Sequence, residues 1–249
     1  MEKINRTPFQ GIVNIIRFNW HFYVLFLLIL VGGLLFTQYP LTRLMLCGAA
    51  IATLSSLVVS WYIYDRSDLY TLRWLDDIKF RPHGRIVNIH AGFDETSQLL
   101  AHKYPGADLQ VFDFYNPEMH TEVSIERARK RYAPYAGTRT ISTAAVPLEA
   151  ASVDVVFLLL AAHEIRDPGE RIIFFKELYR CLAADGRIVV LEHLRDAPNF
   201  IAYTIGFLHF FSRAAWKRAF NNAGLIVVKE KKITPFLSAL ILQKNGIAS

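Results

Sequence analysis

The chain has 249 residues, of which 53% are hydrophobic and 13% aromatic, and it carries a formal net charge of +6 at pH 7. This composition is richer in apolar residues than an ordinary soluble domain needs, so we expect part of the chain to contact lipid. Basic and acidic residues are interspersed along the sequence, which argues against nucleic acid as a partner and is compatible with an anionic membrane surface.

Two uncharged apolar runs, residues 20–37 and 44–64, dominate the N-terminal part of the chain. Each is close to the roughly 20 residues that span a hydrocarbon core. We expect Pro40 to end the first helix and to let a second one begin, which gives a tight transmembrane hairpin. A signal peptide would leave the second run unexplained, whereas a soluble helical pair buried in a large core stays open as an alternative.

Basic residues flank the two outer ends of this hairpin, as at Arg17 and Arg66, whereas Arg43 lies near its turn. The positive-inside rule then places both ends in the cytoplasm. We therefore expect an integral membrane protein with an N-terminal tail and hairpin in residues 1–64. Residues 65–249 would form a cytoplasmic domain.

The pattern beyond residue 65 is that of an α/β protein. Five β-rich runs follow one another, at residues 85–90, 109–115, 138–143, 153–160 and 187–193. Helical stretches such as 94–104 and 169–182 separate them, which predicts a parallel sheet covered by helices on both faces. Two further strand-like runs, 225–231 and 236–243, are joined by a short turn and predict a closing antiparallel hairpin.

Three segments of this region resemble class I S-adenosylmethionine-dependent methyltransferases, and most closely the ubiquinone and menaquinone methyltransferase branch. They are VPLEAASVDVVFLLLAAHEI (146–165), FFKELYRCLAADGRIVVLEHLRD (174–196) and SRAAWKRAFNNAGLIVVKE (212–230). The resemblance implies a Rossmann-like sheet with an antiparallel C-terminal hairpin, S-adenosylmethionine as cofactor and methyl transfer as the reaction. The expected fold class is therefore α/β, preceded by the two-helix transmembrane hairpin.

The run RIVNIHAGFDETSQLL (85–100) is similar to the glycine-rich first motif of that family. Asn88 stands where an acid is usual, and His90, Gly92 and Asp94 stand at the three glycine positions. The resemblance implies that His90, Ala91, Gly92 and Asp94 contact the cofactor. Asp94 also suits an N-cap of the next helix, and this structural role is the preferred one.

The end of the second strand carries the other cofactor element. Asp113 stands where the family's acid accepts hydrogen bonds from both ribose hydroxyls, a task that suits a carboxylate. Phe114 would flank the adenine on one side, and Thr143 and Ala144 would line its other side.

Catalytic groups are expected at the ends of the fourth and fifth strands. His163 and Glu164 follow the fourth strand, and Glu192 and His193 close the fifth, so that they could converge on one pocket. Methyl transfer to a phenol or an acidic ring carbon needs a base, which could be His163 or His193. The carboxylates could instead orient a histidine, hold the substrate or cap a helix.

The acceptor is expected to be a lipophilic molecule dissolved in the bilayer, such as a quinone, a phenolic lipid or a polyene head group. The apolar stretch 199–216 should lie at the membrane interface or cover an apolar pocket, with Arg213, Lys217 and Arg218 toward lipid phosphates. A buried core helix is the alternative. Cys47 and Cys181 lack metal-ligand spacing, so we expect reduced thiols and no bound metal. Oligomeric state is not indicated.

Two other functions stay open. Rhodoquinone-biosynthesis proteins have a degenerate first motif that ends in Asp, as at Asp94, and a His-Glu pair like that at His163 and Glu164; they use the cofactor as an amino donor on a quinone. The third possibility is a membrane-anchored scaffold that catalyses no reaction.

Overall fold

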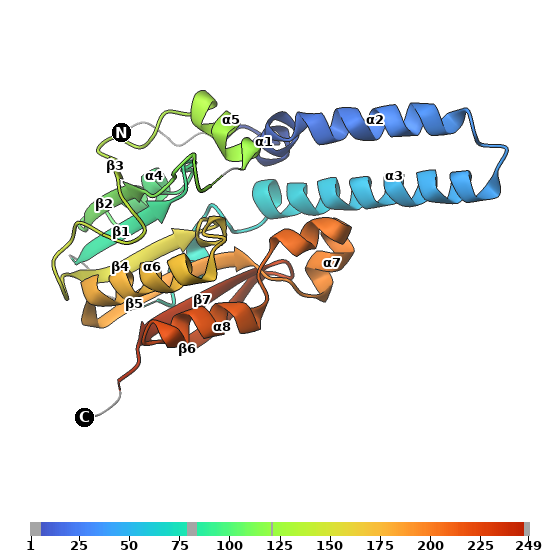
Figure 1. The fold of residues 1–249 in the computed structure, drawn as a ribbon. Coiled ribbons are helices and arrows are strands. Elements are labelled where there is room, and N and C mark those ends of the chain that lie inside the picture. Colours follow the sequence, from blue (N-terminus) through green and yellow to red (C-terminus); the bar gives the residue numbers. More distant parts are fainter. Residues whose placement is uncertain (1–5, 79–83, 121, 247–249) are drawn as a thin grey trace.

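A parallel sheet with an antiparallel end forms the centre of the computed structural model, which describes residues 6–78, 84–120 and 122–246. Its strands are β1 (Arg85–His90), β2 (Asp108–Asp113), β3 (Arg139–Thr140), β4 (Val153–Leu159), β5 (Leu182–His193), β6 (Leu225–Thr234) and β7 (Leu237–Lys244). In this described part the seven strands have the order β3-β2-β1-β4-β5-β7-β6, and β7 is antiparallel to both of its neighbours (Figure 1). The predicted α/β sheet with an antiparallel C-terminal hairpin is confirmed.

Helices and short turns surround this sheet. They are α1 (Gln10–Phe18), α2 (Trp20–Leu34), α3 (Pro40–Trp61), η1 (Tyr62–Arg66), η2 (Arg73–Leu75), α4 (Ser97–Lys103), α5 (Val123–Arg131), η3 (Ala162–Glu164), α6 (Pro168–Cys181), α7 (Ala197–Tyr203), η4 (Thr204–His209) and α8 (Arg213–Asn222). One face of the sheet packs against α6 and α8 through residues such as Phe175 and Trp216. The other packs against the segment after α3 and against α4, through Leu72 and Leu100. Because the central strands are buried on both faces, they are near-continuous apolar runs.

Side-chain caps explain where several helices begin. Asp167 accepts a hydrogen bond from the Glu170 N–H at 2.7 Å, just before Pro168 opens α6. Asp94 lies outside α4, and its Oδ1 accepts hydrogen bonds of 2.9 Å from the N–H groups of Thr96 and Ser97. The N-cap of α4 is Thr96, so the prediction that Asp94 is the N-cap is wrong. Asp94 nevertheless accepts from free N–H groups at the start of this helix, which begins at Ser97 rather than at residue 94.

The N-terminal apolar runs form two helices, α2 and α3, which lie side by side and project away from the sheet (Figure 1). Helix α2 ends at Leu34, and Pro40 occupies the first turn of α3. The prediction that Pro40 ends the first helix is thus wrong, because its fixed φ and missing N–H suit the start of a helix. Arg43 consequently lies within α3.

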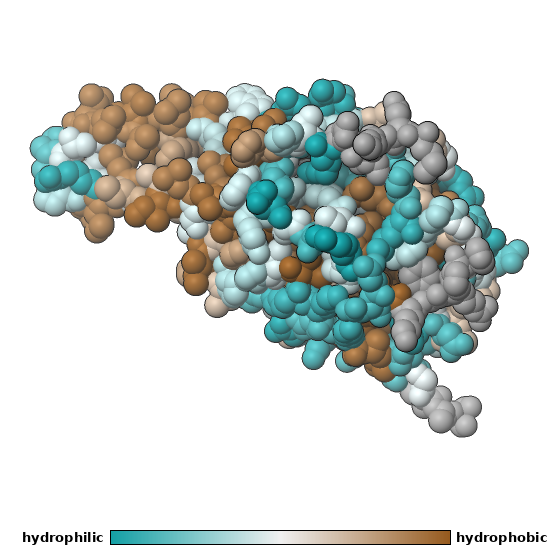
Figure 2. All heavy atoms as spheres, turned by 180° about the vertical axis from the view of Figure 1, so that it is seen from behind, coloured by the Kyte–Doolittle hydropathy of each residue, from teal (hydrophilic) through white to brown (hydrophobic). Residues whose placement is uncertain are grey.

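The hairpin is apolar on its surface. The run Pro40–Arg66 is long and apolar enough to cross a membrane, whereas α1 and α2 meet that test only as a pair bent by 74°. The described residues thus contain one candidate span, or two if the bent pair is a single span. Figure 2 shows apolar side chains along the hairpin on the face in view. Leu28 of α2 and Leu44 of α3 are 64% and 70% exposed.

Helix α1 joins the hairpin to the sheet domain. The carboxylate of Asp65 accepts hydrogen bonds from the N–H groups of Gly11 and Ile12, at 2.7 and 2.9 Å. On the other side of α1, the Tyr132 hydroxyl donates to Asn14 Oδ1 at 2.9 Å. These contacts hold α1 against η1 and against the end of α5.

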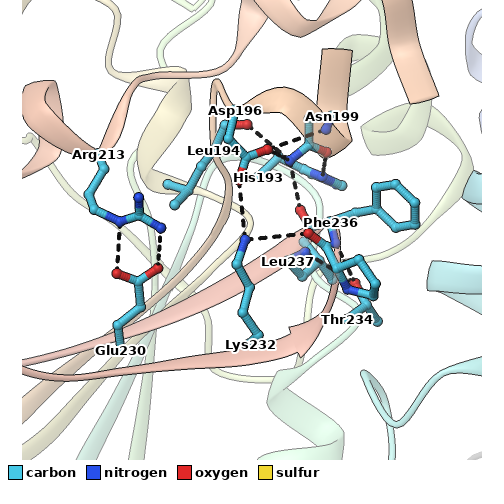
Figure 3. Close-up of polar contacts among 11 residues, drawn as sticks. His193, Leu194, Asp196, Asn199, Arg213, Glu230, Lys232, Thr234, Phe236 and Leu237 are labelled. Atoms are coloured by element: carbon cyan, nitrogen blue, oxygen red, sulfur yellow. Dashed lines mark hydrogen bonds and ion pairs between the residues drawn. The ribbon is translucent and has the colours of Figure 1, made fainter. Parts of the chain in front are cut away.

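The apolar stretch after β5 packs beside the hairpin as α7 and η4. Ile201 and Ile205 are 71% and 80% exposed there, so this part of the stretch is not a buried core helix. The prediction for Arg213 is wrong, because its guanidinium makes a bidentate ion pair with Glu230 at 2.7 and 2.8 Å (Figure 3). A cation that is paired in this way is not directed toward lipid phosphates.

Candidate active site

The carboxyl ends of β1, β4 and β5 open onto a cavity of about 710 Å³. His90 closes β1, His163 lies in η3 after β4, and His193 closes β5; all three line the cavity. This edge of a parallel sheet is where α/β proteins bind ligands. The facing wall comes from the N-terminal helices and η4 and includes Asn14, Phe18, Phe26, Tyr64 and Phe210.

Polar contacts fix the turn after β1. The Asn88 amide donates to Thr96 Oγ1 at 3.0 Å and to Ser97 Oγ at 2.8 Å, so the amide that replaces the usual acid anchors the start of α4. Gly92 has a φ of +85°, and an added Cβ would lie 2.9 Å from side-chain atoms of Ile125 and Arg129. Glycine is required at this position by conformation and by the close approach of α5.

His90 is buried, and neither of its ring nitrogens meets a hydrogen-bond partner within the described part of the chain. Burial lowers the pKa of this imidazole despite the nearby carboxylates of Asp94 and Asp113. A neutral ring with two free polar atoms at the edge of a cavity is a group prepared to contact a ligand.

Asp113 is held by an arginine from α5. Its Oδ1 accepts a hydrogen bond of 2.9 Å from the Tyr115 N–H, and its Oδ2 forms an ion pair with Arg129. The Arg129 guanidinium also lies 4.7 Å from the centre of the Tyr115 ring, and its side chain is 39% exposed. The half-exposed guanidinium of Arg129 therefore forms an ion pair with Asp113, the carboxylate that is predicted to bind the ribose of the cofactor.

The remaining predicted cofactor residues do not line the cavity. Ala91 and Phe114 are buried in the core, and the Phe114 ring lies 5.5 Å from that of Phe174. The Thr143 hydroxyl donates to Glu170 at 2.7 Å, and Ala144 is exposed. The structure thus brings Asp113, Phe114 and Thr143 to one region of the sheet edge, outside the walls of the cavity.

His163 lies between two carboxylates. Its Nδ1 and its backbone N–H contact the two oxygens of buried Glu192 at 2.7 and 3.1 Å, and its Nε2 is 3.1 Å from Glu164. Burial alone would lower the pKa of His163, but the carboxylates outweigh burial and raise the pKa well above its usual value. Three of the four predicted catalytic residues therefore form one cluster.

His193 has a different environment, which Figure 3 shows. The Asn199 amide donates through Nδ2 to Leu194 O and Asp196 Oδ1, both at 2.9 Å, and to Phe236 O at 3.1 Å. Its Oδ1 must then be the atom that faces His193 Nδ1, at 3.2 Å. Nδ1 therefore carries the proton, which leaves Nε2 with a lone pair.

That lone pair is directed toward the cavity. The Tyr64 hydroxyl donates to His193 Nε2 at 3.0 Å, and the Phe210 ring stacks on the imidazole at a centroid distance of 4.6 Å. Burial lowers the pKa of His193 to about 4, and the charge of His163 acts in the same direction. His193 is therefore a neutral acceptor of protons at pH 7, whereas His163 is the more basic ring.

Several residues of this site were not predicted. Tyr64 stood at the end of an apolar run and Asn199 at the start of another, so neither was distinguished as a polar site residue. Arg129 belongs to a charged helix without a recognisable motif. The sequence does contain one signal for Asn199: Asp196 followed by Pro198 marks the start of a helix, and Asn199 lies in the first turn of that helix.

Comparisons with known proteins show which family and fold the chain resembles. Residues 92–190 match the protein family described as a methyltransferase domain. A ubiquinone/menaquinone biosynthesis C-methyltransferase from Geotalea daltonii is 28% identical over 130 residues, which are 51% of this chain and 52% of that protein. The chain thus spans about half the length of this curated relative.

Two solved structures show the similarity of fold. Human N-acetylserotonin methyltransferase in complex with S-adenosylmethionine has a TM-score of 0.51 and 15% identity, over 79% of this chain and 56% of that chain. A methyltransferase from Methanosarcina mazei, also dependent on S-adenosylmethionine, has a TM-score of 0.50 and 16% identity, over 66% and 93%.

Proposed function

We propose that this chain, which carries a class I S-adenosylmethionine-dependent methyltransferase domain, methylates a lipophilic acceptor at the junction of that domain and its apolar hairpin. The observation that carries the proposal is the cavity of about 710 Å³, in which strand-end histidines face side chains of α1, α2 and α3. This apolar wall would suit an acceptor with an apolar chain.

The strand-end residues fit S-adenosylmethionine. Among the described residues, neither ring nitrogen of His90 has a hydrogen-bond partner, and Gly92 has the positive φ that lets the backbone approach a ligand. Asp113 keeps acceptor capacity for ribose hydroxyls once the exposed Arg129 side chain turns away from it. When bound, the cofactor would supply an electrophilic methyl group on a sulfonium centre.

The chain's own part in the reaction is alignment and removal of a proton. His193 Nε2 accepts the acceptor's acidic proton, either directly or through the Tyr64 hydroxyl that already donates to it. Asn199 fixes the ring and its tautomer and is a positioning residue. Phe210 keeps water from one face of the imidazole.

The hairpin explains how an acceptor that hardly enters water would reach His193. Phe22 and Phe26 of α2 line the cavity, and the outer surface of the same helices is apolar. We infer that α2 and α3 insert into the bilayer as an anchor with both ends in the cytoplasm. Tethering then raises the local concentration of a membrane-dissolved acceptor at the site.

Binding of S-adenosylmethionine to the purified full-length chain tests the cofactor assignment. A micromolar dissociation constant by calorimetry, about −8 kcal/mol, would support an enzyme. Absence of binding at millimolar cofactor would favour the scaffold instead.

Removing Arg129, the cation that forms an ion pair with Asp113, should strengthen cofactor binding. We expect Arg129→Gln to tighten S-adenosylmethionine binding by about two- to fivefold, because a half-exposed ion pair contributes up to about 1 kcal/mol. Calorimetry on the variant measures this change. Arg131→Gln, an exposed arginine in the same helix, is the matched control; equal affinities in all three proteins would contradict the role of Arg129.

The wall formed by α2 should select for the acceptor's apolar chain. Phe26→Ser should raise KM for a long-chain quinol or phenol by about tenfold and leave KM for a short-chain analogue unchanged, since burial of a Phe side chain contributes about 1.5–3 kcal/mol. Phe26 is preferred to Phe210 for this test, because Phe210 stacks on His193 and its replacement would also change the environment of that histidine. The control is Leu28→Ser on the exposed side of α2; equal losses with both acceptors would count against a lipophilic substrate.

The topology can be measured by cysteine labelling. In a Cys47→Ser background, which removes the exposed native thiol, a Gln38→Cys variant should react with an impermeant reagent only from the non-cytoplasmic side. Cys181 is buried and should not react with the reagent. Labelling of position 38 only after the membrane is opened would show that the hairpin does not cross.

A further inference from the structure

Four side chains from three segments meet beside the cavity. Ligand atoms of His163, Glu164 and His209 all lie within 4.8 Å of one another. Glu122, which directly precedes α5, adds a carboxylate oxygen 3.4 Å from His209 Nδ1. Two imidazoles and two carboxylates thus converge from η3, η4 and the start of α5.

Glu192 orients the central histidine of this group. Because Glu192 accepts from both Nδ1 and the backbone N–H of His163, the remaining ring nitrogen Nε2 faces Glu164 at 3.1 Å. A carboxylate that holds the far nitrogen of an imidazole is the usual outer partner of a metal-binding histidine.

The cluster contains acceptors in excess of donors. The Glu164 side chain is 7% exposed, and its Oε2 has no hydrogen-bond partner among the residues that the structure describes. Arg166, the adjacent cation, directs its guanidinium to the carbonyl oxygens of His163 and His209 at 3.3 and 2.7 Å. A buried carboxylate oxygen without a partner is costly unless a cation or proton donor reaches it.

We propose that His163, Glu164 and His209 bind a divalent first-row transition-metal cation, with Glu122 as a fourth ligand. Mixed imidazole and carboxylate ligands suit Mn²⁺, Fe²⁺, Co²⁺ or Zn²⁺, whereas Mg²⁺ and Ca²⁺ prefer oxygen alone. Metal–ligand bonds of about 2.0–2.2 Å place neighbouring ligand atoms roughly 3–3.5 Å apart. The separations of 3.1 Å for His163–Glu164 and 3.4 Å for His209–Glu122 match that spacing.

Such a cation would connect parts of the active site. It would link η3, at the end of β4, to η4 and to the start of α5, and it would lie at the cavity wall because His163 lines the cavity. The cofactor residues His90, Gly92 and Asp113 are not among its ligands. Metal binding can therefore be measured without cofactor or acceptor.

The test is a titration of the metal-free full-length chain in detergent with Co²⁺, followed by the visible absorption of the bound ion. We expect about one Co²⁺ per chain, displaced by Zn²⁺ but not by Ca²⁺. Glu164→Gln and His209→Ala should each weaken Co²⁺ binding by at least tenfold, and Glu192→Gln should do so by about 10–100-fold. His102→Ala, which removes an exposed histidine from α4, should bind Co²⁺ as the unchanged protein does.

Circular dichroism and thermal unfolding of the metal-free variants show whether each one is folded. Co²⁺ binding that persists in folded His209→Ala and Glu164→Gln, or Co²⁺ binding no tighter than millimolar in the unchanged chain, would overturn the proposal.

Discussion

Replacing His193 by glutamine should lower kcat by about 10²–10⁴-fold, the usual contribution of a positioned general base. The substitution removes the lone pair at Nε2 that accepts the Tyr64 hydroxyl at the edge of the cavity. Affinity for S-adenosylmethionine should not change, because the predicted cofactor residues belong to β1, β2 and the loop after β3. Single-turnover methyl transfer and calorimetry measure the two quantities separately.

The control is His102→Gln, which changes an exposed histidine that does not line the cavity. Asn199→Ala should give a smaller loss of kcat, because it frees the ring without removing it. If His193→Gln retains full kcat on an acceptor with an acidic proton, the base lies elsewhere and His163 becomes the candidate.

The pH dependence provides a second readout of the same residue. With a pKa of about 4, His193 stays unprotonated far below pH 6.5, so kcat should persist into mildly acidic solution. The unfolded chain binds a proton at this residue near pH 6.5, whereas the folded chain binds it only near pH 4. The free energy of unfolding should therefore fall as pH decreases through that window, and His193→Gln should reduce the fall.

Replacing Asp113 by alanine should weaken S-adenosylmethionine binding by at least tenfold. If Asp113 binds the cofactor as proposed, the change removes the acceptor of two charge-assisted hydrogen bonds to ribose, each worth about 1.5–3 kcal/mol. It also releases Arg129 from its ion pair. Calorimetric dissociation constants for the unchanged chain and the variant measure the effect.

The double variant Asp113→Ala with Arg129→Gln distinguishes the two consequences. The loss of affinity should persist in it if the missing acceptor is responsible, and it should disappear if a freed cation is. Unchanged affinity in Asp113→Ala alone would remove this residue from the cofactor site.

The sheet could be predicted because its strands carry their own signal. A segment such as 153–159 is apolar apart from Asp154, because both of its faces are buried. Helical periodicity predicted α6, and two strand-like runs joined by a short turn predicted the antiparallel hairpin of β6 and β7. Helix α5 gave no such signal, because most of its side chains are charged and it buries little besides Ala128.

The candidate site was predicted residue by residue but not as a geometry. Strand ends indicated His163, Glu192 and His193, since parallel strands bring their carboxyl ends to one edge. His163 and Glu192 form a charged cluster whereas His193 is neutral, and this difference depends on partners that are distant in sequence. Tyr64 lies 129 residues from His193, and no local pattern reports such a contact.

The apolar run that forms α3 and η1 also contains polar residues whose role the sequence did not predict. Hydropathy treats residues 44–64 as one run, although Tyr64 faces a histidine and Ser60 is buried. Helix α1 was predicted as a tail because its amphipathic pattern covers nine residues and its partner α5 was unknown. Tertiary packing, rather than propensity, sets the role of both segments.

The most direct measurement is the product formed by the purified full-length chain from a membrane lipid extract and S-adenosylmethionine deuterated in its methyl group. Mass spectrometry should find the intact deuterated methyl group on a lipid-soluble acceptor, and His193→Gln should abolish it. An acceptor that gains nitrogen instead of the labelled methyl would indicate amino transfer. Label on a water-soluble acceptor alone, or on none while the cofactor binds, would contradict methylation of a lipophilic substrate.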